Sequence, residues 1–350
     1  PDGSGKVPST LENRRELENR GQAVTTLIEA WCHQEKLSLS ATNSEMLLLK
    51  GKLDIRRPPK IHIQRRQIKA SAAVRYLGVH FEKDFKVNTH VQKLKPNCME
   101  KFNSLATVAR VFVPIVTYAA AAWIDGLNKG ATEVLLRAQR QALLRITKAY
   151  NTTSREALLV VAGTLPIDLR VRQAAYAYKV RKGQPFELDG YRFPEDAPET
   201  PPETAIHNTL VAQWQTRWNN ASTGRYTYAI INDIQIRLGM DWLRTNHYVT
   251  QFLTGHGDFA AKLGTLGLSD RRRCLCGTAD ETATHVLLEC RLHEEERRNY
   301  RDRVTLVGLQ WPPPMEQLLH RETFPQLALT ARTILQKKEM SWPLIHTIQQ

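Results

Sequence analysis

The chain has 350 residues, of which 42% are hydrophobic, enough for about two domains with cores of ordinary size. Its formal net charge of +14 indicates a polyanionic partner, and nucleic acid is the first candidate because Lys and Arg neutralise phosphates. A membrane surface is the alternative, but no segment approaches the ~20 apolar residues of a spanning helix, and we expect no membrane partner. The five cysteines form no disulfide-like framework, which excludes a disulfide-rich secreted protein.

The opening of the chain has an α+β pattern. Residues 1–10 are rich in Gly, Ser and Pro, and we expect them to be disordered. Residues 11–36 carry apolar side chains at the spacing of one helix face, from Val24 to Trp31. Short apolar runs separated by basic turns then predict strands, at 37–40, 46–49, 61–63 and 74–79.

After about residue 90 the pattern becomes helical. The apolar spacing predicts helices over 97–110, 112–124, 130–149, 154–162 and 167–182. Thr153 and Glu156 have the spacing of a capping box, Gly163 is the expected C-terminal stop, and Pro166 opens the next helix. The basic face of the 130–149 helix suits either a nucleic-acid backbone or plain solvent; its members are Arg137, Arg140, Arg145 and Lys148.

A segment rich in Pro, Glu and Asp over 183–204 is predicted to be an unpacked linker between two blocks. Two helical stretches follow, at about 205–220 and 226–252, and a Pro-interrupted tail ends the chain at 301–350. Three tryptophans at helical spacing are expected in the core rather than as base-stacking platforms: Trp214, Trp218 and Trp242.

Three cysteines and one histidine gather between the second helical stretch and the tail. They read C-x-C-x8-H-x4-C and are Cys274, Cys276, His285 and Cys290. Three thiolates and one imidazole suit a closed, tetrahedral, structural Zn²⁺ site. Gly277 is expected to allow a sharp turn where a Cβ would crowd the metal. In a helix, His285 and Cys290 would lie about a turn and a half apart. The alternative is that the cysteines are buried apolar residues and that His285 caps a helix.

Two basic segments are candidates for contact with phosphates. Between Lys50 and Lys69 there are eight basic residues and one acid, Asp54, which predicts a positive edge or an ordinary basic loop. The run Arg271-Arg272-Arg273 precedes the Cys/His cluster directly. His256 has no accompanying nucleophile or carboxylate pattern, so we expect a structural role for it.

Five segments in a fixed order carry a resemblance to a known family. They are 31–51, which ends in Met46-Leu47-Leu48-Leu49-Lys50-Gly51; 57–79, which ends in Tyr76-Leu77-Gly78-Val79; 113–123; 152–167; and 253–257. Together they resemble the end of the reverse transcriptase in non-LTR retrotransposons, closest to the R1-like and jockey-like elements of arthropods. The resemblance implies a last palm segment, a hairpin that grips the primer, a helical thumb and a C-terminal knuckle.

The chain departs from the family pattern at the polymerase site. It has no Phe/Tyr-Ala-Asp-Asp strand to hold two metal ions, since Asp2 is the only aspartate before Asp54. Asn43 stands where the family has a lysine, and the chain looks shortened between Val108 and Val111. We therefore expect that it cannot polymerise alone, and we expect Mg²⁺ only at the missing polymerase site. Because no Met precedes Pro1, we expect a fragment of a longer protein, either the distal part of a polyprotein or a decayed copy.

Three functions compete. The first is the nucleic-acid-binding C-terminal portion of a reverse-transcriptase polyprotein, which binds element RNA and target DNA for RNA-directed DNA synthesis. The second is an endonuclease, whose acidic candidates would be Glu294, Glu295, Glu296 and Asp302. The third is a stand-alone adaptor that binds zinc and RNA. The first is preferred, with the rest of the Pol polyprotein as partner and the nucleus, after cytoplasmic assembly, as location.

The expected fold is an α+β remnant of a palm, followed by a mainly α thumb and a C-terminal region with a CCHC zinc knuckle. The expected domains are 1–10, disordered; 11–90, palm end and primer-grip hairpin; 91–182, thumb; 183–204, linker; 205–269, helical region; 270–300, knuckle; and 301–350, tail. The expected nucleic-acid contacts are Arg56, Arg57, Lys60, Arg65, Arg66, Tyr76, Leu77, Gly78, Arg271, Arg272 and Arg273.

Overall fold

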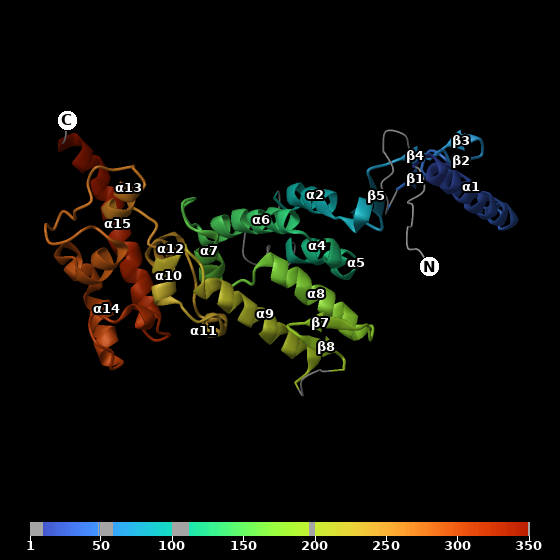
Figure 1. Ribbon diagram of the computed structural model, residues 1–350. Coiled ribbons are helices and arrows are strands. Elements are labelled where there is room, and N and C mark those ends of the chain that lie inside the picture. Colours follow the sequence, from blue (N-terminus) through green and yellow to red (C-terminus); the bar gives the residue numbers. More distant parts are fainter. Residues whose placement is uncertain (1–9, 48, 50–58, 100–111, 196–199, 349–350) are drawn as a thin grey trace, which may run out of the picture. The chain divides into compact units, whose positions relative to one another are not determined.

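The computed structural model describes residues 10–47, 49, 59–99, 112–195 and 200–348 (Figure 1). The chain forms two compact units: Pro1–Leu94 with Ala122–Val134, and Lys95–Ala121 with Leu135–Gln350. Residues 1–9 of the segment 1–10 that was expected to be disordered lie outside the described residues, and Thr10 belongs to the first helix. The shortening predicted between Val108 and Val111 also lies outside the described residues. None of the described helices combines the length and the apolar character that crossing a membrane requires.

The first unit begins with α1 (Thr10–Gln34), as the helical spacing predicted. Gln22 on this helix pairs with both backbone groups of His62: its Nε2 donates to the carbonyl oxygen at 3.1 Å, and its Oε1 accepts from the N–H at 2.9 Å. This amide pair ties α1 to the strands that follow. The predicted apolar face stays exposed within this unit, at 55% for Val24, 71% for Leu27 and 56% for Trp31.

The strands of the first unit are short and form two-stranded pairs. β1 (Glu45–Met46) pairs in parallel with β4 (Lys69–Ala70), β2 (His62–Ile63) pairs antiparallel with β3 (Arg66–Gln67), and β5 (Ala73–Tyr76) pairs antiparallel with β6 (Val79–Glu82). The strand predicted at 37–40 does not form, because only two of its four side chains are apolar and no partner strand pairs with it. The strand predicted at 46–49 shrinks to β1.

The single strand predicted at 74–79 is wrong, because the chain reverses in its middle. Leu77 has φ 45° and Gly78 has φ 87°, and two consecutive positive φ values form the two-residue hairpin turn that matches the twist of the strands. Tyr76 then pairs with Val79 across the turn. The resemblance had implied a hairpin here, and β5 and β6 form one.

Trp123 is buried in the first unit. It ends α5 (Ala120–Trp123) and precedes the 3-10 turn η3 (Ile124–Gly126). The ring of His90, on α2 (Asn88–Met99), packs edge-on against it with 5.3 Å between centroids. Burial lowers the pKa of His90 to about 4, so this ring is neutral at physiological pH and packs as an aromatic side chain.

The predicted helices of the second unit form, with one interruption. They are α4 (Val113–Thr117), α6 (Lys129–Thr147), whose first turns belong to the first unit, α7 (Arg155–Ala162), α8 (Ile167–Arg181) and α9 (Pro202–Asn219). The continuous helix predicted over 112–124 is wrong, because Ala119 adopts a left-handed φ of 50° between α4 and α5. Most of the helix predicted at 97–110 lies outside the described residues.

The start of α7 differs from the predicted capping box. Ser154, rather than Thr153, is the N-cap, and its Oγ accepts from the Ala157 N–H at 3.2 Å. The Glu156 carboxylate accepts instead from the Thr223 hydroxyl at 3.0 Å. The predicted C-terminal stop is confirmed, because Gly163 adopts a left-handed φ of 63° and its N–H donates back into the last turn.

The prediction of an unpacked linker over 183–204 is wrong. β7 (Phe186–Leu188) and β8 (Tyr191–Phe193) form an antiparallel hairpin in this segment. The Phe186 and Phe193 rings stack with 4.7 Å between centroids, and both belong to the core cluster. The prolines lie outside both strands, so these few apolar side chains suffice to hold the hairpin against the helices.

The stretch predicted as one helix over 226–252 contains α10 (Arg225–Ile230), α11 (Ile234–Gly239) and α12 (His247–Thr254). The breaks have a local cause, because Asp233 and Asn246 each turn a side-chain oxygen back to the first backbone N–H groups of the helix that follows. α13 (Ala260–Thr265) then leads to the Cys/His segment.

Residues 301–350 are not a tail. α14 (Glu294–Leu306) and α15 (Phe324–Ile348) belong to the second unit, joined by the short 3-10 turn η6 (Met315–Gln317). Val304, Leu327 and Ile334 are fully buried in the core cluster. Of the prolines that suggested an irregular segment, Pro312, Pro313 and Pro314 lie in the connection between the two helices, Pro325 lies in the first turn of α15, and Pro343 lies further along α15.

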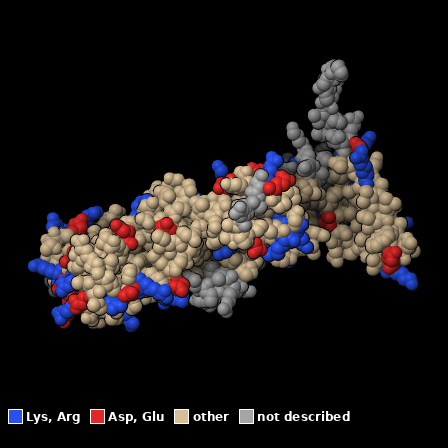
Figure 2. Space-filling model, turned by 90° about the horizontal axis from the view of Figure 1, so that it is seen from below, with Lys and Arg blue, Asp and Glu red and all other residues tan. Residues whose placement is uncertain are grey.

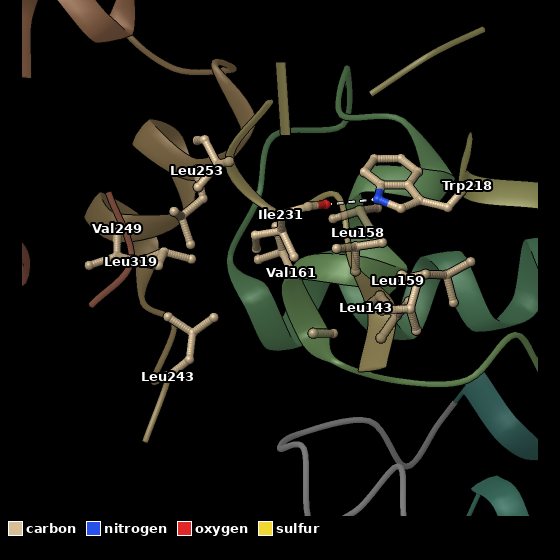
Figure 3. Close-up of a cluster of buried hydrophobic side chains, with 14 of the residues drawn as sticks. Leu143, Leu158, Leu159, Val161, Trp218, Ile231, Leu243, Val249, Leu253 and Leu319 are labelled. Atoms are coloured by element: carbon tan, nitrogen blue, oxygen red, sulfur yellow. Dashed lines mark hydrogen bonds between the residues drawn. The ribbon is translucent and has the colours of Figure 1, made fainter. Parts of the chain in front are cut away.

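One core cluster runs through the second unit, from Leu143 to Leu335 (Figure 3). Trp218 lies in it, and its indole Nε1 donates to the carbonyl oxygen of Ile231 at 2.8 Å. Trp214 is buried as well, and Trp242 packs against the cluster. The prediction that these tryptophans belong to the core is confirmed.

A buried arginine closes the C-terminal end of α7. The Arg237 guanidinium donates to the carbonyl oxygens of Val160 at 2.9 Å and Val161 at 2.8 Å in the last turn of the helix, and the Val160 carbonyl also accepts from the Gly163 N–H at 3.0 Å. Burial lowers the pKa of Arg237 to about 10, so it still carries its charge. A Cβ at Gly163 would lie 2.9 Å from the guanidinium carbon.

We expect Gly163→Ala to lower the free energy of unfolding by about 2–4 kcal/mol, because it combines a positive φ with a collision against a fixed arginine. The control is Gly183→Ala, where φ is +60° and nothing lies within 4 Å of the added Cβ. It should cost only the strain of the positive φ, about 1–2 kcal/mol. Urea unfolding of both variants measures the difference; equal losses would contradict the role of Arg237.

Candidate metal centre

Two of the four candidate ligands lie in a tight loop held by backbone hydrogen bonds. The Cys274 N–H donates to the Ala279 carbonyl oxygen at 2.9 Å, and the Gly277 N–H donates to the Cys274 carbonyl oxygen at 3.0 Å. Gly277 has a φ of +80°, which favours glycine, but nothing lies within 4 Å of a Cβ added there. The backbone conformation is therefore a constraint at this position, and the expectation that a Cβ would crowd the metal stays a prediction.

The other two ligands lie at the ends of a π-helical turn, His285–Glu289. The Cys290 N–H donates to the His285 carbonyl oxygen at 2.8 Å, a bond between residues five apart. Such a turn is wider than an α-helix and brings residues five apart towards the same side. The H-x4-C spacing therefore fits a π-turn, and the α-helical expectation of a turn and a half is corrected.

The four side chains converge on one point. The Sγ atoms of Cys274, Cys276 and Cys290 and a ring nitrogen of His285 all lie within 4.8 Å of one another, and all four residues are buried. The Cys274 and Cys290 sulfurs are 3.5 Å apart, and Cys276 Sγ lies 3.2 Å from His285 Nε2. Tetrahedral Zn²⁺ with Zn–S of ~2.3 Å and Zn–N of ~2.0 Å needs ligand separations of about 3.5–3.8 Å. The observed separations lie on both sides of this range, and the four side chains could hold a metal ion such as zinc.

The thiols require a cation if all three are to ionise. Burial raises the pKa of Cys274 to about 12, and burial also raises the pKa of Cys290. Burial acts in the same direction on Cys276, but hydrogen bonds from Thr278 outweigh it and bring this pKa to about 5. A bound dication would stabilise three thiolates side by side.

Polar groups outside the cluster orient two of the ligands. The Glu289 carboxylate lies 3.4 Å from His285 Nδ1, which leaves Nε2 directed at the cysteines. The Arg291 guanidinium donates to the Cys276 carbonyl oxygen at 2.8 Å and so joins the loop to the end of the π-turn.

Arg297, on α14, donates hydrogen bonds to the backbone of the π-turn. Its side chain is 1% exposed, and it donates to the carbonyl oxygens of Leu287 at 3.0 Å and Val286 at 3.1 Å. Glu294 balances its charge at 3.0 Å. These bonds satisfy carbonyls that the short turn leaves without helical partners, so Arg297 fixes the segment that carries two ligands.

The three arginines before the cluster have different surroundings. Arg271 pairs with the buried carboxylate of Glu281 at 2.9 Å. Arg272 approaches Asp280 only to 3.8 Å, and both side chains are about half exposed. Arg273 is exposed. Contact of this run with nucleic acid stays a prediction, and the geometry assigns Arg271 a structural partner first.

The other predicted nucleic-acid residues belong to the first unit. Arg56 and Arg57 lie outside the described residues. Exposed basic side chains gather around the β2–β3 hairpin: Lys60, Arg65 and Arg66. Tyr76, Leu77 and Gly78 are at the tip of the β5–β6 hairpin, where the first two side chains are exposed.

Figure 2 shows, on the face that it draws, basic side chains interspersed with acidic ones rather than one continuous basic surface.

Comparison with known proteins identifies the family. The chain is 32% identical over 324 residues to the "Retrovirus-related Pol polyprotein from type-1 retrotransposable element R1 4" of Nasonia vitripennis, an alignment that covers 82% of this chain and 81% of that protein. The chain belongs to the Pol polyproteins of R1 retrotransposable elements. The resemblance inferred from the five sequence segments is therefore confirmed.

Longer R1 relatives match the same chain. It is 29% identical over 306 residues to the "Putative 115 kDa protein in type-1 retrotransposable element R1DM" of Drosophila melanogaster, with 81% of this chain and 30% of that protein covered. It is 26% identical over 322 residues to the R1 Pol polyprotein of Bradysia coprophila, of which it spans 31%. No family model and no solved structure matches the chain.

Sequence reasoning on the R1 Pol chain missed the groups that support the metal centre. Glu289 was detectable, because it stands four residues after His285 and so faces the same side of a helical turn. Arg297 and the buried Glu281 gave no such signal. Glu281 lies between Arg271 and Lys338, and Lys338 comes from α15, 57 residues further along the chain.

Two of the four acidic residues considered for an endonuclease form ion pairs. Glu294 pairs with Arg297 and Arg301, and Glu296 pairs with Lys337. Within the part of the chain that the structure describes, the Cys/His cluster is the only group of three or more His, Cys, Asp or Glu side chains that could hold a metal ion.

His256, for which we expect a structural role, lies with its Nδ1 2.9 Å from the Thr152 hydroxyl.

Proposed function

We propose that this R1 Pol chain is the nucleic-acid-binding C-terminal portion of a reverse transcriptase, which holds template RNA and target DNA for RNA-directed DNA synthesis in transposition. The observation that carries the proposal is the set of four buried ligand atoms within 4.8 Å of one another. Four protein ligands complete a tetrahedral Zn²⁺ site and leave no position for a reacting water, so the ion is structural. A folded knuckle, residues 270–300, then presents turns and arginines to unstacked bases and phosphates.

The first unit would act on the primer. The exposed tip of the β5–β6 hairpin, with Tyr76 and Leu77, is the segment that we assign to the primer end. The basic side chains around β2–β3 would contact the phosphate backbone beside it. The helices within 97–182 would form the thumb that clasps the duplex.

The remainder of the Pol polyprotein would be the protein partner. Two of the relatives are more than three times as long as the part that this chain matches. The exposed apolar side chains of α1, from Val24 to Trp31, are a surface for that contact. Mg²⁺ would belong to the polymerase site, outside this chain. The protein would assemble with its RNA in the cytoplasm and act on target DNA in the nucleus.

The first test is the zinc content of the purified chain, combined with RNA binding at several salt concentrations before and after chelation. We expect about one zinc per chain, and chelation should weaken RNA binding at least tenfold, ~1.4 kcal/mol. The slope of affinity against salt should also fall, because phosphate contacts made by the folded knuckle are lost. A chain with no zinc, or with unchanged RNA binding after chelation, would overturn the proposal and shift attention to the basic segment around Lys60.

A further inference from the structure

A cleft of about 380 Å³ lies in the second unit beside the knuckle, and no function has been assigned to it above. Its walls come from the start of α10, the end of α12, α13 and the knuckle, with Arg225, Tyr226, His256, Lys262, Arg272 and Thr282. The volume falls in the range of ~300–1,000 Å³ that is usual for ligand pockets. Thr282 stands three residues before the ligand His285, so the cleft has this wall only when the knuckle is folded.

The charges around the cleft are of one sign. Arg225, Lys262 and Arg272 line it, and no Asp or Glu is among its lining residues. Lys262 has no carboxylate partner among the described residues, and Asp280 approaches Arg272 only to 3.8 Å. A cleft lined by cations and by no acidic side chain concentrates anions. Its electrostatics therefore suit a phosphate group.

Arg225 differs from the other two cations because its guanidinium is already bonded within the protein through Nη1. Its Nη1 donates to the carbonyl oxygen of Trp218 at 3.0 Å, and its guanidinium lies 3.6 Å from the centroid of the Tyr228 ring. It contributes a fixed positive charge to the wall. Lys262 and Arg272 are the side chains with free donors for a ligand.

The rest of the cleft wall consists of neutral groups. Gly255 has a φ of +66°, and a Cβ there would lie 3.0 Å from the Tyr226 ring, so the backbone passes directly against this aromatic. The hydroxyl of Tyr226 lies 3.1 Å from that of Thr284. Burial, with Lys262 nearby, lowers the pKa of His256 to about 4, so its ring is neutral at physiological pH. Neutral ring surfaces next to cations suit a base beside its phosphate.

We propose that this cleft binds one unstacked nucleotide of a single-stranded nucleic acid, with Lys262 and Arg272 on the phosphate and the Tyr226 and His256 rings beside the base. The inference rests on the proposed function and narrows it. It assigns the contact to Arg272 rather than to the whole basic run, because Arg271 already compensates the buried Glu281. It also adds Lys262 and His256, which lie outside the knuckle.

The test compares two charge-matched double variants of the full zinc-loaded chain. Lys262→Gln with Arg272→Gln removes both cleft donors, and Arg298→Gln with Arg321→Gln removes two exposed arginines elsewhere in the second unit. The probe is a fluorescent oligouridylate of about 12 nucleotides, a length within the usual site size of ~4–16. Anisotropy at several salt concentrations gives the affinity and its salt slope, and zinc content and circular dichroism confirm that each variant is folded.

We expect the cleft variant to bind about tenfold more weakly and to lose about 0.7 from the salt slope, the value for one phosphate on a single strand. The control should stay within about twofold of the wild type. If both double variants bind the oligonucleotide equally while the wild type binds RNA in a zinc-dependent manner, the assignment of nucleotide binding to the cleft is wrong and the proposed function stands. If the wild-type chain does not bind the oligonucleotide at all, both are overturned.

Discussion

Cys276→Ser should remove the metal from the chain and unfold the knuckle. A serine hydroxyl is a poor ligand for zinc, and three ligands in a site built for four do not hold the ion tightly. Binding of structural zinc contributes about 10–16 kcal/mol of apparent folding free energy in comparable small sites, so most of the order around His285 depends on it. This is the largest effect that we expect from any single substitution.

The loss of structure after Cys276→Ser should extend to the C-terminal helices but not to the helices that precede the metal centre. Leu287 and Leu288, inside the π-turn, are buried in the core cluster with Val304 of α14 and Ile334 of α15. These C-terminal helices should therefore lose protection with the knuckle. The helices of the second unit that precede the metal centre, such as α8, should stay folded, because their contacts do not pass through the four ligands.

Zinc content and limited proteolysis followed by mass spectrometry measure both parts of this result. The control is Cys32→Ser, which changes a cysteine of α1 in the first unit and should leave zinc binding intact. A Cys276→Ser protein that kept about one zinc and resisted proteolysis near residue 285 as well as the wild type does would show that the four side chains are ordinary core residues.

Arg297→Met should be the most costly substitution that touches no metal ligand. It keeps most of the apolar length of the side chain but leaves the Val286 and Leu287 carbonyl oxygens without donors in a buried position. Two unsatisfied buried groups at ~1–3 kcal/mol each, together with imperfect packing, predict a loss of about 3–5 kcal/mol in the free energy of unfolding. Because the π-turn then loosens, zinc should also dissociate faster.

Arg298→Met is the matched control, since the neighbouring side chain is exposed and should change stability by less than about 0.5 kcal/mol. Urea unfolding at saturating zinc gives the free energies, and transfer of zinc to a coloured chelator gives the dissociation rate. Equal behaviour of the two variants would mean that Arg297 does not support the site. If Arg297→Met lowered the free energy of unfolding without faster zinc release, Arg297 would stabilise the core but not the metal site.

The helical half of the fold was predictable because its signals are local. The apolar spacing and the caps at Gly163 and Pro166 gave α7 and α8 to within a residue. Prediction from local patterns failed where a single residue with positive φ interrupts an element, at Ala119 within the expected helix and at Leu77 within the expected strand. Positive φ at residues other than glycine is imposed by the surroundings, so no sequence pattern marks it.

The segment 183–204 shows a second limit. Its composition is that of a linker, yet three aromatic and aliphatic side chains at Phe186, Leu188 and Phe193 pack a hairpin onto the core. Composition averages over a window, whereas packing depends on whether a few side chains meet a complementary surface. The last fifty residues were misjudged for the same reason, because the prolines between α14 and α15 hid two well-packed helices.

The sequence alone determined the family, the four candidate ligands and the surplus of positive charge, because residue type and spacing carry these directly. The tertiary structure decided the rest. It brought Lys338 of α15 to Glu281, Arg297 to the π-turn, and Lys262 to the same cleft as Arg272. These partners are far apart along the chain or on separate elements, and only the packing of the second unit sets the distances between them. The types of ligand at the Cys/His cluster can thus be read from the sequence. The side chains that support the cluster, and the cations that line the neighbouring cleft, are brought together only by the fold.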